Sequence, residues 1–304
     1  IGDSLFSPIS LALTTFGILF IHLFSNLYND YFDVTHGADE ANTEYFNAGM
    51  NSSMLKGAQL SGGSRAVELG LITLKGTKSL ANIMFMFGLL TAAGILYISY
   101  LNTGSTSNSY HSAIIALIGV LIGYFYTAKP IKLSSRYGLG EIAIFLSFGP
   151  LLTLGSGFAI SMETIQLFSN EFYNLMILGV PIGLLTTNIL FINQFPDYTS
   201  DKKVGKNHLV VLFGKKASRW IYAINLALAT GSLYYMAVEN IVNETQDSLF
   251  LYVLIPITII YSFYLISGLF KYYNNRKLIK YNIHTIYFHM LFSFIYMIIL
   301  ANFQ

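Results

Sequence analysis

Cysteine is absent from this chain of 304 residues, which excludes disulfide bonds and thiolate metal sites. Charge is also scarce, because Asp, Glu, Lys and Arg together make up only 11% of the residues. The net charge of +2 gives no electrostatic support for nucleic-acid binding. The six histidines never form a His-x-x-x-His pair, which argues against a zinc hydrolase. In so uncharged a chain, the position of each carboxylate is informative.

Apolar residues dominate instead, at 54% of the chain and with a mean hydropathy of +0.56. Apolar runs of about 20 residues recur along the whole length, which is typical of membrane-spanning helices. We therefore expect an all-α, polytopic transmembrane bundle that forms a single membrane-embedded domain over residues 1–304. The eight expected spans are 5–29, 77–101, 112–128, 139–161, 172–195, 217–238, 249–270 and 283–302.

The basic residues are confined to alternate connections between these spans. All 17 of them fall in one set of connections or, for Lys78 and Arg219, in the first three residues of the span that follows, and the other set (before residue 5, 102–111, 162–171 and 239–248) holds only acidic charges. The positive-inside rule therefore places the basic connections on the cytoplasmic side of the membrane. The same alternation supports the count of eight spans, because one span more or fewer would scramble it.

Two polar stripes lie on that cytoplasmic side, at the ends of two apolar segments. Residues three and four apart share one face of a helix. The first stripe follows that spacing with Asn26, Asn29, Asp30 and Asp33, and Asp39 comes soon after it. Carboxylates at membrane-helix ends have an energetic cost that a fold alone does not require.

The second stripe has strict four-residue steps, with Asn193, Asp197 and Asp201. Mg²⁺ prefers oxygen ligands and commonly bridges carboxylates to substrate phosphates. Two facing stripes are therefore suited to two Mg²⁺ ions with a diphosphate between them. Basic residues suited to bind that anion are found near both stripes. They are Arg65, Lys129, Lys132, Lys202, Lys203 and Lys206.

Several of these residues also have simpler interpretations. A lone Asp at a helix end is more often a solvated cap, and it is the pairing of two periodic stripes that favours a site. Lys202, Lys203 and Lys206 fit equally well as topogenic charges, and Lys215, Lys216 and the 271–280 group fit that role better than binding. Asn188 fits an interhelical hydrogen bond. His22, one turn before Asn26, fits a packing or hydrogen-bonding role better than catalysis.

At these residues the chain resembles the UbiA superfamily of intramembrane prenyltransferases. The matching segments are 29–33 with Asp39, 126–130 with Tyr126 and Lys129, 138–141, and 193–201 followed by Gly205 and Lys206. Residues 62–65 resemble the branch that prenylates 1,4-dihydroxy-2-naphthoate for menaquinone. The resemblance runs from about residue 20 to residue 215, and the last three spans match only in hydropathy. The motifs depart from the family at Gly37 and Gln194, where many relatives have an acid.

The resemblance implies nine transmembrane helices around a central cavity, of which the eight expected spans correspond to the last eight. We expect the missing first helix to precede residue 1. It also implies Mg²⁺-dependent transfer of a polyprenyl chain to an aromatic acceptor. Asp30, Asp33, Asp197 and Asp201 would hold the metal, with Asp39 in a further catalytic role. The substrate-binding residues would be Asn26, Asn29, Arg65, Tyr126, Lys129, Asn193 and Lys206. The segment 34–76 would cover the site as a lid.

Three alternatives remain open at the level of sequence. The first is another acceptor that relatives use: 4-hydroxybenzoate, homogentisate, haem or a glycerol phosphate lipid. A secondary transporter also places carboxylates in a membrane, although near its midplane. A non-catalytic membrane assembly protein is the third alternative. The sequence sets neither prenyl chain length nor oligomeric state.

Overall fold

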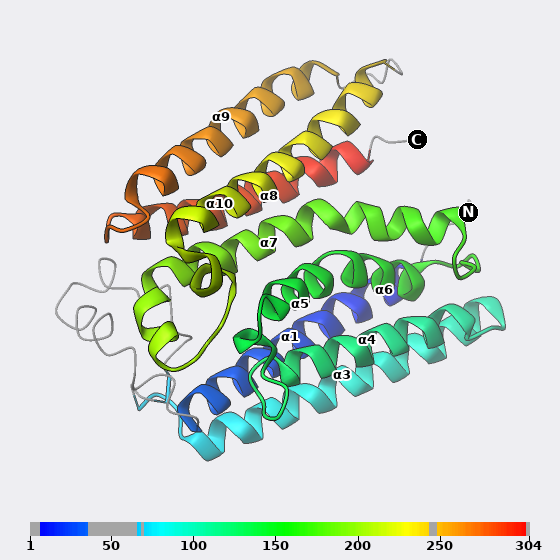
Figure 1. The fold of residues 1–304 in the computed structure, drawn as a ribbon. Helices are drawn as coiled ribbons and strands as arrows, with labels where there is room; N and C mark the ends of the chain where they lie inside the picture. Colours follow the sequence, from blue (N-terminus) through cyan, green and yellow to red (C-terminus); the bar gives the residue numbers. More distant parts are fainter. Residues whose placement is uncertain (1–6, 36–65, 68–69, 243–247, 302–304) are drawn as a thin grey trace.

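The computed structural model describes residues 7–35, 66–67, 70–242 and 248–301, which are almost entirely helical. The long helices are α1 (Pro8–Thr35), α3 (Leu74–Thr103), α4 (Ser107–Phe125), α7 (Asn170–Lys203), α8 (Leu209–Val242), α9 (Ser248–Tyr272) and α10 (Leu278–Ala301) (Figure 1). The short helices are η2 (Leu133–Ser135), α5 (Leu139–Phe148) and α6 (Pro150–Ile160). Each of the eight expected spans coincides with described helix, which confirms the all-α fold class.

Seven stretches of the described residues are long and apolar enough to cross a membrane, with α5 and α6 together forming one of them. Of the eight expected spans, α8 is the one that does not meet this criterion. It carries Lys215, Lys216 and Arg219 near its beginning, and Asn225 further along. It still packs lengthwise against α7 and α9 as part of the bundle (Figure 1).

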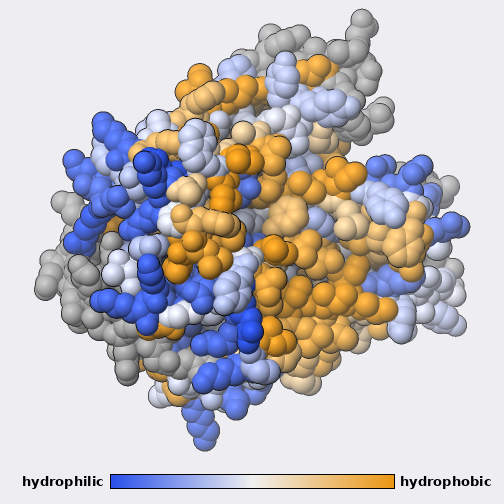
Figure 2. Space-filling view, in the orientation of Figure 1, coloured by the Kyte–Doolittle hydropathy of each residue, from blue (hydrophilic) through white to orange (hydrophobic). Residues whose placement is uncertain are grey.

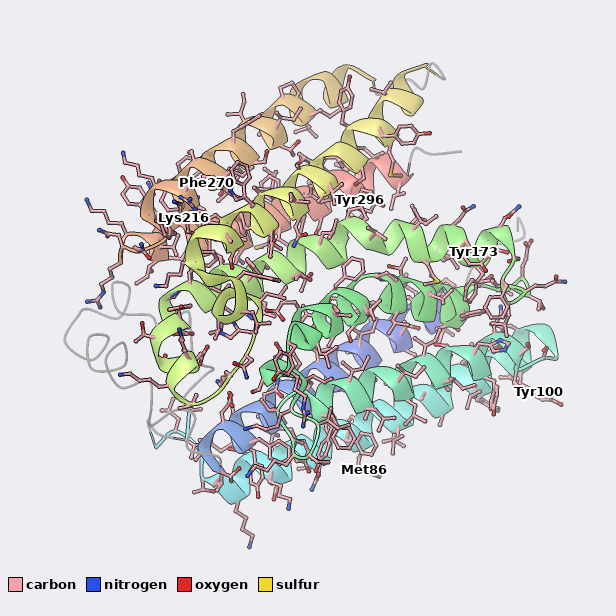
Figure 3. The ribbon with its side chains drawn as sticks, viewed as in Figure 1. Met86, Tyr100, Tyr173, Lys216, Phe270 and Tyr296 are labelled. Carbon is pink, nitrogen blue, oxygen red and sulfur yellow. The ribbon has the colours of Figure 1, made fainter. Side chains whose placement is uncertain are left out.

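The surface of the bundle is suited to lipid. Figure 2 shows a broad apolar surface with hydrophilic residues gathered toward the two ends. Met86 is exposed in the middle of α3, whereas Tyr100 and Tyr173 are exposed near helix ends on the side away from Lys216 (Figure 3). Tyrosine at the edges of an apolar band is typical of membrane–water interfaces. These features and the spans describe a multi-pass integral membrane protein.

Helix α7 divides the bundle into a solid half and a hollow half. It packs against α8 and α10 on one side and against α5 and α6 on the other. The side with α8, α9 and α10 is filled by large, fully buried side chains such as Phe191, Tyr222, Phe288 and Phe292. The other side, formed with α1, α3 and α4, encloses a cavity.

The expected span 139–161 is two helices because the chain breaks at Gly149, and Pro150 begins α6. A Cβ atom on Gly149 would lie 2.7 Å from the Phe145 carbonyl oxygen and 2.8 Å from the Gly179 carbonyl oxygen. Gly183, one turn after Gly179, also meets the backbone at Phe145 and Gly149. Glycines on both sides therefore let α7 approach the break closely, as small residues do between membrane helices.

Candidate functional site

Both polar stripes form the last helical turns of α1 and α7, as expected, but these helices are longer than the apolar spans. Helix α1 continues beyond the expected limit of residue 29 to Thr35, and α7 continues beyond residue 195, through Pro196, to Lys203. The prediction of the helix ends was wrong because it followed the apolar runs, whereas the helical hydrogen bonding continues through the polar turns. The added turns hold the carboxylates in a fixed helical register.

The first stripe is tied to the loop that follows α4. The Thr127 hydroxyl donates to Asn29 Oδ1 at 2.5 Å, and Thr127 is buried. Asn26 Nδ2 lies 3.1 Å from His22 Nε2, one turn earlier on α1. Tyr126 is half-buried, and its desolvation, followed by the negative charges of Glu141 and Asp33, raises the pKa of its hydroxyl above the usual range. The α4–α5 loop therefore forms one wall of the site.

The two stripes meet, although more than 160 residues separate them in the sequence. Asp33 lies close enough to Asp201, Lys132 and Lys206 to interact with them electrostatically. Asp201 Oδ1 is 3.6 Å from Lys206 Nζ, and Asp201 Oδ2 is 3.0 Å from His208 Nε2. A carboxylate on α1 thus lies within electrostatic range of a carboxylate on α7 and of two lysines.

Those lysines form a concentrated positive charge. Burial lowers the pKa of Lys132, and the neighbouring charges of Lys129 and Lys206 lower it further, while Asp33 acts in the opposite direction. Like charges held together in this way favour the binding of an anion, which relieves their repulsion. The structure therefore brings Lys129 and Lys206, both expected site residues, together with Lys132.

Two loops are joined to hold this group in place. Asn207 N donates to the Ser135 carbonyl at 3.2 Å, linking the α7–α8 loop to the α4–α5 loop. Arg136 stabilises the α4–α5 loop internally, because its side chain donates hydrogen bonds to the carbonyl of Pro130 at 2.8 Å and to the carbonyl of Ile131. Lys132 and Lys206 therefore lie on loops that are bonded to each other.

A buried carboxylate supports the second stripe from behind. Glu141, in the first turn of α5, is 3% exposed. Its Oε1 accepts hydrogen bonds from Gln194 Nε2 at 3.0 Å and from Leu209 N at 2.9 Å. Gln194 on α7 thus pairs with an acid from another helix. Because Leu209 follows His208, Glu141 fixes both α7 and the loop that carries the Asp201 partner.

Asn193 and Asp197, the other two members of the second stripe, interact with residues of α10 and α8. Asn193 Oδ1 accepts a hydrogen bond from Asn282 Nδ2 at 2.8 Å, which ties α7 to α10. Asp197 is buried and lies close enough to Lys215 to interact with it electrostatically. Asn188 makes the expected interhelical hydrogen bond, donating to the Tyr222 carbonyl at 3.0 Å.

Below the polar end lies an apolar cavity of about 380 Å³. Asn26, Asn29 and Tyr126 line it at the polar end, and Thr14 and Ser109 line it toward the opposite membrane face. Along α1 it extends from Thr14 to Asn29, about 22 Å at the helical rise of 1.5 Å per residue. No lysine or arginine is among its described lining residues.

Some expected site residues are not brought into this arrangement. Asp39 and Arg65 lie outside the described residues, as does most of the segment 34–76 expected to form a lid. Within the described part of the chain, no group of three or more Asp, Glu or His side chains is close enough to hold a metal ion by itself. Asp30 does lie near Asp33 and interacts with it electrostatically.

The structure also adds residues that the sequence analysis did not select. Thr127, His208 and Asn282 contact expected site residues, Lys215 interacts electrostatically with Asp197, and Glu141 bonds Gln194, the neighbour of Asn193. His208 and Thr127 lie within or next to the motif segments, so their position was a usable signal. Asn282 and Lys215 come from α10 and α8, and no local pattern connects them to the stripes.

An apolar cavity capped by lysines, amides and carboxylates defines a membrane protein that can bind an amphiphile with an anionic head. Comparison with known proteins gives the family. The chain belongs to the UbiA prenyltransferase family, whose family model matches residues 2–295.

Its relatives include two enzymes named 1,4-dihydroxy-2-naphthoate octaprenyltransferase. The one from Bacillus subtilis is 26% identical over 70% of this chain and 58% of its own length. The one from Escherichia coli is 30% identical over 76% of this chain and 64% of its own length. The chain thus spans less than two thirds of either relative.

A UbiA homolog from Archaeoglobus fulgidus, solved with GPP and Mg²⁺, has the same fold. Its TM-score is 0.53 at 17% sequence identity, and the match covers 95% of this chain and 88% of that one.

Proposed function

We propose that this protein transfers a polyprenyl chain from a polyprenyl diphosphate to an aromatic acceptor in a Mg²⁺-dependent reaction. We further propose that the acceptor is 1,4-dihydroxy-2-naphthoate and that the reaction belongs to menaquinone biosynthesis. The observation that carries the proposal is the meeting of the two polar stripes directly above an apolar cavity. The names of the naphthoate-specific relatives support the choice of acceptor.

The donor set fits a hard cation that shares its ligands with a substrate. Asp33, Asp197 and Asp201, with Asp30, supply carboxylate oxygens from two helices, yet no three of them form a closed metal centre. Mg²⁺ is commonly held in this way, by one or two carboxylates together with substrate phosphates. When bound there, Mg²⁺ would neutralise the charge of the departing diphosphate.

The lysines hold the same head group from the loop side. Lys129 and Lys206, with Lys132 between them, bind phosphate oxygens as point charges. Asn29, Asn193 and Tyr126 supply neutral polar contacts. Arg65 and Asp39 complete the set in this proposal on the strength of the motif resemblance.

The prenyl tail lies in the apolar cavity, where it needs no polar partner. The basic connections face the cytoplasm by the positive-inside rule, so the head group binds on the cytoplasmic side. The burial of Asp197 limits the access of water to the reacting carbon.

The reaction breaks the carbon–oxygen bond of the prenyl diphosphate, and diphosphate departs with the bonding electron pair. The electron-rich ring carbon attacks the allylic cation and forms the new carbon–carbon bond. In a naphthoate acceptor that carbon carries the carboxylate, which leaves as CO₂ and returns its electron pair to the ring. No proton has to be removed from the ring in this step.

The test is a prenyl-transfer assay on Asp33→Asn and Asp197→Asn with increasing Mg²⁺. Each variant removes a carboxylate charge, and we expect at least a hundredfold loss of turnover. Glu171→Gln, which changes a carboxylate at the opposite membrane face, is the matched control and should retain wild-type activity. Full activity in either aspartate variant would refute the metal–diphosphate site.

A further inference from the structure

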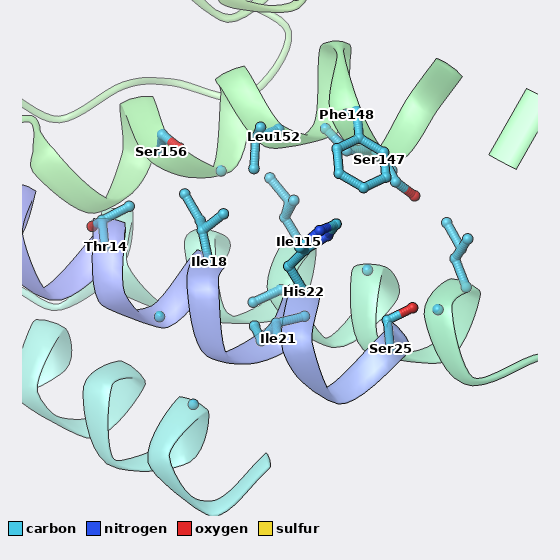
Figure 4. A pocket seen from close by; sticks show the side chains of 18 of the residues that line it. Thr14, Ile18, Ile21, His22, Ser25, Ile115, Ser147, Phe148, Leu152 and Ser156 are labelled. Carbon is cyan, nitrogen blue, oxygen red and sulfur yellow. The ribbon is translucent and has the colours of Figure 1, made fainter. Parts of the chain in front are cut away.

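The middle of the cavity carries polar side chains that the diphosphate site does not use. His22 and Ser25 lie on α1, and Ser147 and Phe148 lie on α5. Figure 4 shows His22 directed across the cavity toward the wall that carries Phe148 and Ser147. The His22 and Phe148 rings meet edge to face, with centroids 5.5 Å apart and planes at 87°.

Two side chains in the middle of the cavity, Ser147 and His22, have polar atoms without a hydrogen-bond partner among the described residues. Ser147 Oγ is buried and has no hydrogen-bond partner among the described residues. His22 Nε2 faces the Asn26 amide nitrogen, which can only donate, so Nε2 accepts and the ring proton is assigned to Nδ1. Nδ1 makes no hydrogen bond within the described part of the chain. Unpaired polar groups in an apolar cavity cost free energy until a ligand satisfies them.

Only one part of the two substrates matches these groups. The prenyl tail is a hydrocarbon and offers no hydrogen bond. The diphosphate needs cations, and none of the described cavity-lining residues is lysine or arginine. A hydroxyl on the aromatic acceptor is neutral and can both donate and accept a hydrogen bond. The flat apolar ring that carries this hydroxyl can pack against the Phe148 ring.

We propose that His22, Ser147 and Phe148 form the subsite for the hydroxyl-bearing ring of the aromatic acceptor. This inference rests on the proposed function. His22 lies seven residues before Asn29 on α1, a rise of about 10 Å. The hydroxyls and the reacting carbon of the acceptor belong to the same ring, so a ring bound through one hydroxyl at His22 holds its reacting carbon on the side toward the Asn29 end, where the diphosphate site begins.

The test uses the full chain in lipid nanodiscs with Mg²⁺, geranylgeranyl diphosphate and 1,4-dihydroxy-2-naphthoate. His22→Phe and Ser147→Ala each remove one hydrogen bond to the acceptor. We expect the acceptor KM to rise about three- to tenfold in each variant, the effect of one neutral hydrogen bond. The KM for the prenyl diphosphate should stay within about twofold, and His22→Gln should restore most of the acceptor affinity.

Ser262→Ala is the matched control. Ser262 carries a buried hydroxyl on α9 that donates to the Ile259 carbonyl at 2.8 Å, and it does not line the cavity. It should leave both KM values unchanged. If His22→Phe proves unstable in a thermal melt, Ser147→Ala decides the question alone.

The outcomes separate the two proposals. If the wild type converts the naphthoate and the acceptor KM of Ser147→Ala and His22→Phe is unchanged, the subsite is refuted and the proposed function stands. The subsite is also refuted if only the prenyl diphosphate KM rises, because the polar groups then serve the tail. If the wild type neither converts nor binds an aromatic acceptor in calorimetry, the proposed function fails and the subsite fails with it.

Discussion

At the scale of single residues, the site is organised by side chains that hold the aspartates rather than by the aspartates alone. Asp201 is held by His208 and Lys206, and Asn29 by Thr127. Glu141 anchors the helix and the loop on which the second stripe depends. Such partners fix the orientation of carboxylates before a metal or phosphate arrives.

We expect His208→Ala to raise the Mg²⁺ concentration needed for half-maximal activity by about 10- to 100-fold, because partners of metal-binding carboxylates have effects of this size. His208→Gln keeps a nitrogen donor and should recover most of the loss. The measurement is activity as a function of Mg²⁺ at saturating substrates. An unchanged Mg²⁺ curve for His208→Ala would show that the contact at 3.0 Å does not position Asp201.

The sequence could indicate the stripes because their periodicity of three and four residues is local. It indicated Asn26, Asn29, Asp33, Asn193, Asp197 and Asp201, and of these the structure brings Asp33 and Asp201 within electrostatic range of each other. It could not show that Asn282 on α10 bonds Asn193, or that Lys215 approaches Asp197. Those contacts depend on how distant helices pack, which no spacing in the chain records.

At the scale of secondary-structure elements, hydropathy located the helices but misjudged where two of them end and where one breaks. The polar turns of α1 and α7 look like loop residues by composition, yet they continue the helices. The break at Gly149 occurs inside an apolar run, where hydropathy carries no signal. The Gly149-Pro150 pair was the available indication, since Pro at the first position of a helix favours a new start.

The close approach of α7 to this break gives a stability prediction. Gly183→Ala places a Cβ atom 2.6 Å from the Phe145 carbonyl oxygen, so the helices must separate. We expect destabilisation of about 1–3 kcal/mol, the usual cost of overpacking, measured as thermal or denaturant unfolding in detergent. Gly231→Ala on α8 meets no atom within 4 Å and should be neutral or slightly stabilising. Equal melting temperatures for the two variants would contradict the packing described for α7.

At the scale of the whole molecule, the two halves of the bundle differ in how they are packed. The α7–α10 half is filled by large aromatic and aliphatic side chains, and it holds α7 rigid. The half with α1, α3 and α4 is lined by smaller side chains and leaves an apolar cavity beneath the polar site. The positive-inside pattern and the lysine group agree in placing the anion site at the basic end of the bundle.

The central claim is that the two polar stripes form one diphosphate site whose apolar cavity serves prenyl transfer. The most direct test is the mass of the product formed by the purified chain in nanodiscs with geranylgeranyl diphosphate, 1,4-dihydroxy-2-naphthoate and Mg²⁺. The account predicts a naphthalene-diol product, or its quinone, in which the prenyl group replaces the carboxylate. It also predicts that no such product forms when EDTA removes the Mg²⁺. Intact acceptor in both reactions, or equal product with and without Mg²⁺, would contradict it.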